Sequence, residues 1–251
     1  MCEVFLQRNT NRRMEDQERT WRNPIEKARA AGIREAAMGL SAGWGSNWSG
    51  EFAHEDRISE LRRQWDAWTE AGITVVRVDM ADPMAWNTPA QVAEDLRAIK
   101  QSFPSVREFH LHLHNARGMA MLSAYEALKA LGADDTLMLD TALGGIGGCP
   151  YCGNGQATGM IPTEDLVQLL EVENVPTGID LGKLIEAASV LEDVLGRKLD
   201  GRVSRNGPLP SGPSLYDVDM PAVYTFNEAQ HFLKGPAVYE GNPRPWVRSP
   251  K

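Results

Sequence analysis

Two spacings of apolar residues alternate along this chain. Alternation of apolar and polar residues with a period of two, or a short apolar run, is typical of a buried strand, whereas apolar residues three and four apart are typical of a helix face. Strands are predicted at 4–6, 33–38, 73–78, 109–115 and 136–140. Helices are predicted at 12–31, 58–68, 88–99 and 122–128. Regular alternation of strand and helix predicts a parallel sheet with helices packed against it.

Local signals support several of these helix boundaries. Thr88 offers an N-cap hydroxyl, Pro89 suits the first helical position, and Gln91 suits the third. Pro24 must start a new helix or kink the one in which it lies. Glycines follow several of the predicted helices, where C-caps belong.

The positions of the chemically interesting residues favour one α/β fold over another. They lie at or just after the carboxyl ends of predicted strands, where barrel enzymes build active sites. An open sheet would concentrate them at one switch point, and no Gly-x-Gly-x-x-Gly follows an early strand. We therefore predict a (β/α)8 TIM-barrel fold, incomplete with about five βα units. Residues 1–200 would form this partial barrel, and 201–251, rich in Pro and Gly, an extended C-terminal tail packed on it.

The strand at 109–115 carries the first candidate chemistry. His110, His112 and His114 alternate with apolar residues and so share one face. His112 and His114 reach the strand end, where two imidazoles can hold one divalent ion and leave its other positions open. The alternative is a strand whose inner face is polar and hydrogen-bonded. His110 lies one layer deeper, where a hydrogen-bonded core histidine is expected.

A glycine-rich loop after the fifth predicted strand carries the second group of candidate functional residues. Gly147 and Gly148 precede Cys149, so we expect a substrate-binding loop that presents a functional thiol. A buried structural thiol is the alternative. Cys149 and Cys152 form a C-x-x-C, which with the histidines would suit a structural zinc site, although no second C-x-x-C or H-x3-H accompanies it.

Further polar and aromatic residues follow the strands. We expect Asp79, Asp82 and Asn115 to orient the metal ligands by hydrogen bonds, and Asp140 also ends a strand. Each aspartate is equally suited to capping a turn or helix. The tryptophans Trp44 and Trp48 would line an acyl or adenine surface, or pack against the body of the protein.

Composition and charge narrow the function classes. The net charge is −8, with 26 Lys and Arg against 34 Asp and Glu, and no basic block is present, so nucleic acid is not an expected partner. No apolar run is long enough to span a bilayer, and no leader pattern is visible, so we expect a soluble cytoplasmic protein without a membrane partner. Three cysteines do not make a disulfide framework.

Several motifs occur together in a familiar order. They are His112-Leu113-His114-Asn115, Gly147-Gly148-Cys149-Pro150-Tyr151, Thr163-Glu164-Asp165-Leu166-Val167 and Thr177-Gly178-Ile179-Asp180-Leu181. In this order and spacing the chain resembles the 3-hydroxy-3-methylglutaryl-CoA lyase family of the Asp-Arg-Glu metallolyase barrels, most clearly over 73–195.

The resemblance implies a carbon–carbon lyase that acts on an acyl-CoA. The expected reaction is retro-Claisen cleavage of 3-hydroxy-3-methylglutaryl-CoA, or a similar 3-hydroxyacyl-CoA, to acetyl-CoA and a keto product. His112 and His114 would bind Mg²⁺ or Mn²⁺, and Cys149 would lie on a mobile loop over the substrate. Cleavage needs the hydroxyl deprotonated and the departing enolate stabilised, and a hard cation that chelates hydroxyl and carboxylate oxygens does the first and helps hold the geometry.

The chain also departs from the family pattern. The family carries an Asp-Arg pair on its first strand, for which we find no counterpart, and the resemblance begins near the family's fourth strand. Met160 stands where the family has a metal-binding asparagine, and a thioether is a poor ligand for Mg²⁺. We therefore place Asn154 in that role.

These departures leave other functions open. The chain could instead be a related aldolase or carboligase, or a fragment that keeps the fold without the chemistry. Five βα units leave open sheet edges, which a homodimer or further units would cover. We expect the 251-residue chain alone to cleave the substrate poorly, because one lost oxyanion partner commonly costs about two to three orders of magnitude in rate.

Overall fold

The computed structural model describes residues 2–156, 159–218, 220, 223–242 and 244–246. The chain forms two compact units, 1–162 and 163–251. The boundary therefore falls before the last two long helices, which belong with the C-terminal residues. Among the described helices, none has the length and apolar character needed to cross a membrane.

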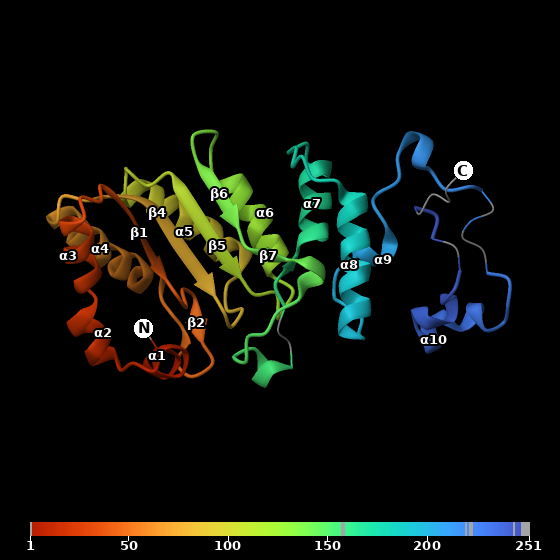
Figure 1. The fold of residues 1–251 in the computed structure, drawn as a ribbon, viewed down its shortest axis with the longest axis horizontal. Coiled ribbons are helices and arrows are strands. Elements are labelled where there is room, and N and C mark those ends of the chain that lie inside the picture. The colour runs from red at the N-terminus through yellow and green to blue at the C-terminus, as the bar shows by residue number, and fades with distance from the viewer. Residues whose placement is uncertain (1, 157–158, 219, 221–222, 243, 247–251) are drawn as a thin grey trace. The chain divides into compact units, whose positions relative to one another are not determined.

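A parallel sheet forms the centre of the first unit. Its strand order is β1-β4-β5-β6, and every neighbouring pair is parallel. The strands are β1 (Glu35–Leu40), β4 (Thr74–Asp82), β5 (Glu108–Leu113) and β6 (Thr136–Leu139). Helices α4 (His54–Glu70), α5 (Pro89–Ser102) and α6 (Ala120–Ala130) lie on one side of it (Figure 1). The predicted α/β architecture with a parallel sheet is confirmed.

Strand β5 shows why the period of two positions the candidate chemistry. Phe109, Leu111 and Leu113 are at most 1% exposed, as residues under the helix layer should be. His110 and His112 point to the opposite face and remain partly exposed. The apolar residues thus anchor the strand, and the imidazoles are displayed on the face that the helices leave uncovered.

The N-terminal segment differs from the prediction. Residues 4–6, predicted as a strand, lie in helix α1 (Glu3–Thr10). The Sγ atom of Cys2 accepts a hydrogen bond from the backbone N–H of Phe5 at 3.4 Å and so caps this helix, while Phe5 is buried. Helices α2 (Met14–Thr20) and α3 (Asn23–Ala30) follow. The main sheet consequently has one strand fewer than the five expected, within the part of the chain that the structure describes.

Short elements complete the first unit. The antiparallel pair β2 (Gly45–Ser46) and β3 (Gly50–Glu51) lies in the loop after β1. Strand β7 (Thr141–Ala142) pairs in parallel with β8 (Ile161–Pro162), which leads directly into the next long helix. Between β7 and β8 runs the glycine-cysteine loop, with 3-10 turns at Leu143–Gly145 and Gly153–Gly155.

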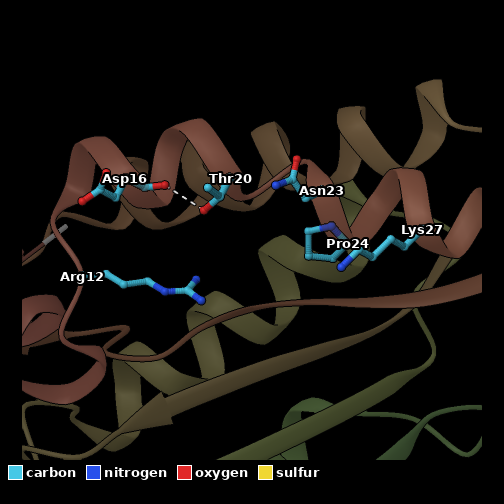
Figure 2. Close-up of a pocket in the computed structure, with 6 residues that line it drawn as sticks. All are labelled: Arg12, Asp16, Thr20, Asn23, Pro24 and Lys27. Carbon is cyan, nitrogen blue, oxygen red and sulfur yellow. Dashed lines mark hydrogen bonds between the residues drawn. The ribbon is translucent and has the colours of Figure 1, made fainter.

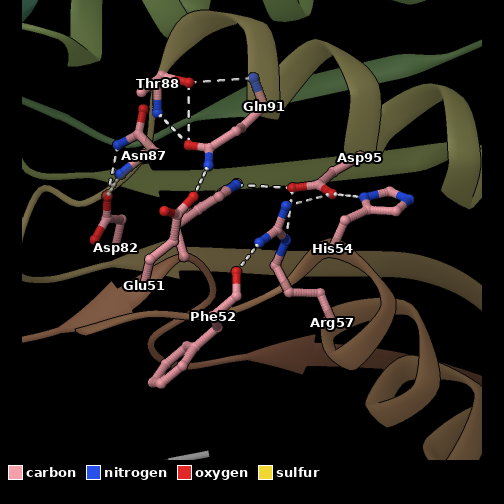
Figure 3. A network of polar contacts seen from close by, with 10 residues as sticks. Glu51, Phe52, His54, Arg57, Asp82, Asn87, Thr88, Gln91 and Asp95 are labelled. Carbon is pink, nitrogen blue, oxygen red and sulfur yellow. Dashed lines mark hydrogen bonds and ion pairs between the residues drawn. The ribbon is translucent and has the colours of Figure 1, made fainter. Parts of the chain in front are cut away.

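A buried ion pair ties α4 to α5. The carboxylate of Asp95, 1% exposed, pairs with Arg57 Nε at 2.9 Å and lies 2.6 Å from His54 Nδ1 (Figure 3). Trp44 Nε1 donates to the same carboxylate at 2.8 Å. Arg57 also donates to the carbonyl of Phe52 at 2.6 Å. The network fixes the loop after β1 against two helices.

The N-terminus of α5 is capped as the sequence predicts. Thr88 and Gln91 form a complete capping box (Figure 3), and the Gln91 side chain also donates to Glu51. Replacing Thr88 with alanine removes the hydroxyl acceptor, so we expect a loss of about 1 kcal/mol in the free energy of unfolding. Urea denaturation followed by circular dichroism measures it. Thr10→Ala, on an exposed hydroxyl at the end of α1, is the matched control and should change stability less.

The second unit contains two long helices and several short ones. They are α7 (Thr163–Val172), α8 (Leu181–Leu195), α9 (Val203–Asn206) and α10 (His231–Lys234), with 3-10 turns at Gly212–Ser214, Glu228–Gln230 and Pro236–Tyr239. Asp180 caps α8 by accepting from the Lys183 N–H at 3.1 Å. Asp165 accepts from the N–H groups of Arg202 and Val203, which attaches α9 to α7. The segment predicted as an extended tail is thus partly helical.

Candidate active site

A row of imidazoles and carboxylates crosses the uncovered face of the sheet. His110 Nδ1 lies 3.0 Å from Asp79 Oδ1, and His110 Nε2 lies 2.9 Å from Asp140 Oδ1. The other oxygen of Asp140 lies 2.8 Å from His112 Nδ1. The row ends at His114, whose Nε2 is 3.2 Å from His112 Nε2. Groups from β4, β5 and the end of β6 therefore meet at one edge of the sheet.

The protonation of these groups follows from their neighbours. Burial alone would lower the pKa of His110, but hydrogen bonds and charge from Asp140 and Asp79 raise it. Burial opposes ionisation of Asp140 as well, yet hydrogen bonds from His110 and His112 lower the pKa of Asp140. Burial and the charge of His112 lower the pKa of His114, against the smaller effect of Asp82. His114 is thereby kept neutral, which is the form that binds a metal.

The geometry of His112 and His114 suits a shared cation. Because Asp140 accepts from His112 Nδ1, the lone pair of that ring lies on Nε2, which faces His114. Two buried atoms beside this pair, His114 Nδ1 and Asp82 Oδ1, have no hydrogen-bond partner among the described residues. Two imidazole nitrogens that face each other at this distance can share a divalent metal ion in place of a proton.

The backbone of the glycine-cysteine loop requires glycine at Gly144 and Gly145, which precede the predicted Gly147 and Gly148. Gly144 and Gly145 have φ of 62° and 71°, which disfavours other residues, and a Cβ at Gly145 would lie 3.0 Å from Pro162 Cγ. Gly147 is half-buried, and Gly148 is exposed with open space around it. The bend at Gly144 and Gly145 brings the following cysteines back toward the strand ends.

Both cysteines of the loop reach the site. The thiols of Cys149 and Cys152 donate to the carbonyl of Pro83, at 3.4 Å and 2.9 Å. Their Sγ atoms and a ring nitrogen of His114 all lie within 4.8 Å of one another. Burial, with the neighbouring Cys149, raises the pKa of Cys152 to about 11. Cys149 is half-buried and Cys152 is 1% exposed, so Cys149 is the more accessible thiol.

Aromatic contacts hold the loop in place. The Tyr151 ring meets Phe5 edge-on at 5.2 Å between centroids and Trp48 at 5.8 Å. Asn47 donates to the Tyr151 carbonyl at 2.6 Å. Trp48 therefore supports the loop, and Trp44 is 1% exposed in the protein core. For both tryptophans the packing alternative describes what the structure shows.

The residues predicted to orient the metal ligands occupy three different places. Asp79 contacts His110. Asp82 Oδ2 accepts from the backbone and side chain of Asn87, at 2.7 Å and 2.6 Å, and so caps a turn. Asn115 Oδ1 accepts from Ala120 N–H at 3.2 Å, at the start of α6. The carboxylate that directly contacts a predicted ligand is Asp140.

The predicted third ligand lies in an exposed turn. Asn154 adopts φ of 54° in the 3-10 turn Gly153–Gly155, and its role as a ligand stays a prediction. Met160, by contrast, forms an antiparallel bridge with His114 and is 9% exposed. The position that the resemblance assigns to a metal-binding asparagine is thus next to the histidine, and it holds a thioether.

Asp140 and Cys152 contact the site more directly than their sequence patterns indicate. Asp140 ends a strand beside the histidine strand, so parallel pairing of β5 with β6 places it there. The C-x-x-C spacing was the available signal for Cys152. No sequence signal points to the Pro83 carbonyl, which both thiols contact.

Another hollow lies away from this row. A pocket of about 450 Å³ is lined by residues of α2, α3 and the chain around them (Figure 2). The residues are Arg12, Asp16, Thr20, Asn23, Pro24 and Lys27. Its single carboxylate, on Asp16, is bonded to Arg19 at 2.6 Å. The row of histidines therefore remains the stronger candidate for chemistry.

Comparison with known proteins gives consistent relatives. (R)-citramalyl-CoA lyase of Chloroflexus aurantiacus is 42% identical over 130 residues, 52% of this chain and 39% of that protein. Hydroxymethylglutaryl-CoA lyase YngG of Bacillus subtilis is 33% identical over 145 residues, 58% of this chain and 46% of that protein. The chain spans about half the length of the curated relatives it matches.

Solved structures share the fold. A hydroxymethylglutaryl-CoA lyase of Acinetobacter baumannii, in complex with coenzyme A and 3-methylmalate, superposes with a TM-score of 0.65 at 22% identity, covering 89% of this chain and 66% of that one. The Bacillus subtilis enzyme gives 0.63 at 27% identity, covering 81% and 64%. These neighbours support the TIM-barrel type of the α/β fold.

The family comparison covers most of the chain. A family model described as HMGL-like matches residues 1–191, which include the four-stranded sheet, the histidine row and the glycine-cysteine loop. The resemblance inferred from the His-x-His and Gly-Gly-Cys-Pro-Tyr motifs is therefore confirmed: the chain belongs to the HMGL-like family.

Proposed function

We propose that this chain is the metal-binding part of an acyl-CoA lyase that cleaves 3-hydroxy-3-methylglutaryl-CoA or a similar 3-hydroxyacyl-CoA to acetyl-CoA and a keto product. The observation that carries the proposal is the convergence of His112 Nε2 and His114 Nε2, 3.2 Å apart, with the Cys149 thiol close to His114. The names of the relatives support the reaction class, and citramalyl-CoA is a second candidate substrate because the 42% identical relative is a citramalyl-CoA lyase.

His112 and His114 would hold the divalent cation, Mg²⁺ or Mn²⁺. Such an ion, when bound, supplies positive charge that favours loss of the hydroxyl proton and holds the oxygens of the substrate in place. Asp140 fixes the ring of His112 so that Nε2 stays available. The lowered pKa of His114 keeps that ring unprotonated near neutral pH.

Cys149 suits the second proton transfer of the reaction. Cleavage of the carbon–carbon bond leaves a carbanion on the acetyl-CoA fragment, which must gain a proton. The Cys149 thiol holds its proton in a long hydrogen bond to Pro83 and is more accessible than Cys152. Tyr151, anchored on Phe5 and Trp48, limits how far the loop can move from this position.

The partner and the setting are also proposals. We infer a homodimer, because β1 and β6 are the edges of the sheet in the part of the chain described. We also infer the cytoplasm as the location, where reduced cysteines such as the three free ones seen here are stable.

Acetyl-CoA release tests the lyase proposal. We expect weak turnover of 3-hydroxy-3-methylglutaryl-CoA or citramalyl-CoA that requires Mg²⁺ or Mn²⁺. Cys149→Ser should lower it by about 100-fold or more, as expected for loss of a general acid. Cys2→Ser, at a cysteine whose Sγ accepts from Phe5 N–H, is the matched control and should leave turnover unchanged. The proposal would be contradicted if the unmodified chain released acetyl-CoA from neither substrate faster than the His112→Ala/His114→Ala variant does.

A further inference from the structure

A second grouping of donors at the strand ends shares Cys149 and His114 with the proposed reaction and adds Cys152. Cys149, Cys152 and His114 offer two sulfurs and one nitrogen within 4.8 Å of one another. In a tetrahedral zinc site, with bonds of about 2.0–2.3 Å, neighbouring ligand atoms lie roughly 3.3–3.8 Å apart. The three donors are thus within small side-chain rotations of that arrangement.

Among the described residues, these three side chains have few other polar partners. Both thiols share the single carbonyl of Pro83, at 3.4 Å and 2.9 Å. His114 is 7% exposed, and its Nδ1 lacks a hydrogen-bond partner among the described residues. Buried polar atoms are normally paired, so an unpaired nitrogen beside two converging thiols indicates a missing ligand.

The chemistry of the donors selects the kind of ion. Sulfur donors favour Zn²⁺ and similar thiophilic ions over Mg²⁺, which prefers oxygen. Met160, whose backbone pairs with that of His114, stands where the family resemblance expects an amide oxygen. This corner of the site is therefore matched to a softer ion than the one proposed for His112 and His114.

We propose that Cys149, Cys152 and His114 form a binding site for a thiophilic divalent cation such as Zn²⁺. Each thiol releases its proton to water on binding, and the sulfur turns from the Pro83 carbonyl to the metal. The fourth position is left to water. This site does not depend on the lyase proposal, and its occupation would withdraw Cys149 and His114 from the proposed catalysis.

Cobalt spectroscopy tests the site directly. Co²⁺ added to the reduced 251-residue chain under anaerobic conditions should give a near-ultraviolet thiolate-to-cobalt charge-transfer band. The band should saturate at one ion per chain and be bleached by Zn²⁺. Cys149→Ser and Cys152→Ser should each remove most of the band and weaken Zn²⁺ binding by more than about 100-fold, since loss of a ligand exceeds the effect of losing a residue that merely supports one.

The matched control is Cys2→Ser. Cys2 is buried, as Cys152 is, but its Sγ caps α1, so the band should survive its replacement. Far-ultraviolet circular dichroism confirms that each variant is folded, and Cys152→Ala replaces Cys152→Ser if the latter is not. Absence of the band in the wild type, its persistence without Cys152, or its equal loss in Cys2→Ser would overturn the proposal. The band does not depend on turnover. A protein that shows the band but has no lyase activity would therefore support the metal-site proposal and contradict only the lyase proposal.

Discussion

Replacing His112 and His114 together with alanine is expected to abolish Mn²⁺ binding, with an affinity loss well above about 100-fold. Replacing a residue that only orients a metal ligand lowers metal affinity by up to about 100-fold. Here the proposed ligands themselves are removed, so the loss should be larger. The two Nε2 atoms face each other at 3.2 Å, so no other pair of described imidazoles at this edge replaces them. Isothermal titration calorimetry with Mn²⁺ measures the loss.

Two controls make this result specific. His231→Ala removes an imidazole from the second unit, where Nδ1 contacts the carbonyl of Glu228, and should leave Mn²⁺ affinity unchanged. Cys152→Ser should also leave it nearly unchanged, because a thiol contributes little to binding a hard ion. Unaltered Mn²⁺ binding in the double alanine variant would show that the histidine pair is not the site.

Replacing Asp95 with alanine is expected to destabilise the first unit by about 3–5 kcal/mol. The change leaves the Arg57 guanidinium, whose side chain is 2% exposed, buried without its counter-charge, and such a loss is among the most destabilising known. It also removes the acceptor of Trp44 Nε1. For a chain of this size that loss lowers Tm by roughly 6–20 °C, which thermal unfolding monitored by tryptophan fluorescence can detect.

An exposed ion pair provides the comparison. Glu26 and Arg29 pair at 2.9 Å with both side chains more than half exposed, so Glu26→Ala should cost at most about 1 kcal/mol. Replacing both members of the buried pair, as Arg57→Met/Asp95→Leu, should recover much of the stability lost in Asp95→Ala. Equal Tm values for Asp95→Ala and Glu26→Ala would show that the buried network does not stabilise the fold.

Periodicity was enough to predict the sheet and the face that carries the chemistry. The alternation from Phe109 to His114 defined both the buried and the displayed side of β5. The capping signal at Thr88 was also correct, since its hydroxyl accepts from the third following N–H. These are local properties, and local sequence determines them.

The errors arose where the local signal was short or the contact was distant. Residues 4–6 are three apolar positions, too few to distinguish a strand from a helix. The structure places them in a helix that Cys2 caps. Trp44 belongs to the core because Asp95, 51 residues away, accepts its N–H. The convergence of Cys149 and Cys152 on Pro83 likewise depends on a contact between distant segments.

The row from Asp79 through His110, Asp140 and His112 to His114 has a consequence for any pH titration of this protein. Each member lies within 3.2 Å of the next. His110 and Asp140 shift each other's pKa, so gaining a proton at one of these two positions changes the proton affinity of the other. The protons are then taken up by the row in macroscopic steps. An inflection in a pH profile of metal binding would therefore be an apparent constant of the whole row, in which His110 takes part without touching the ion.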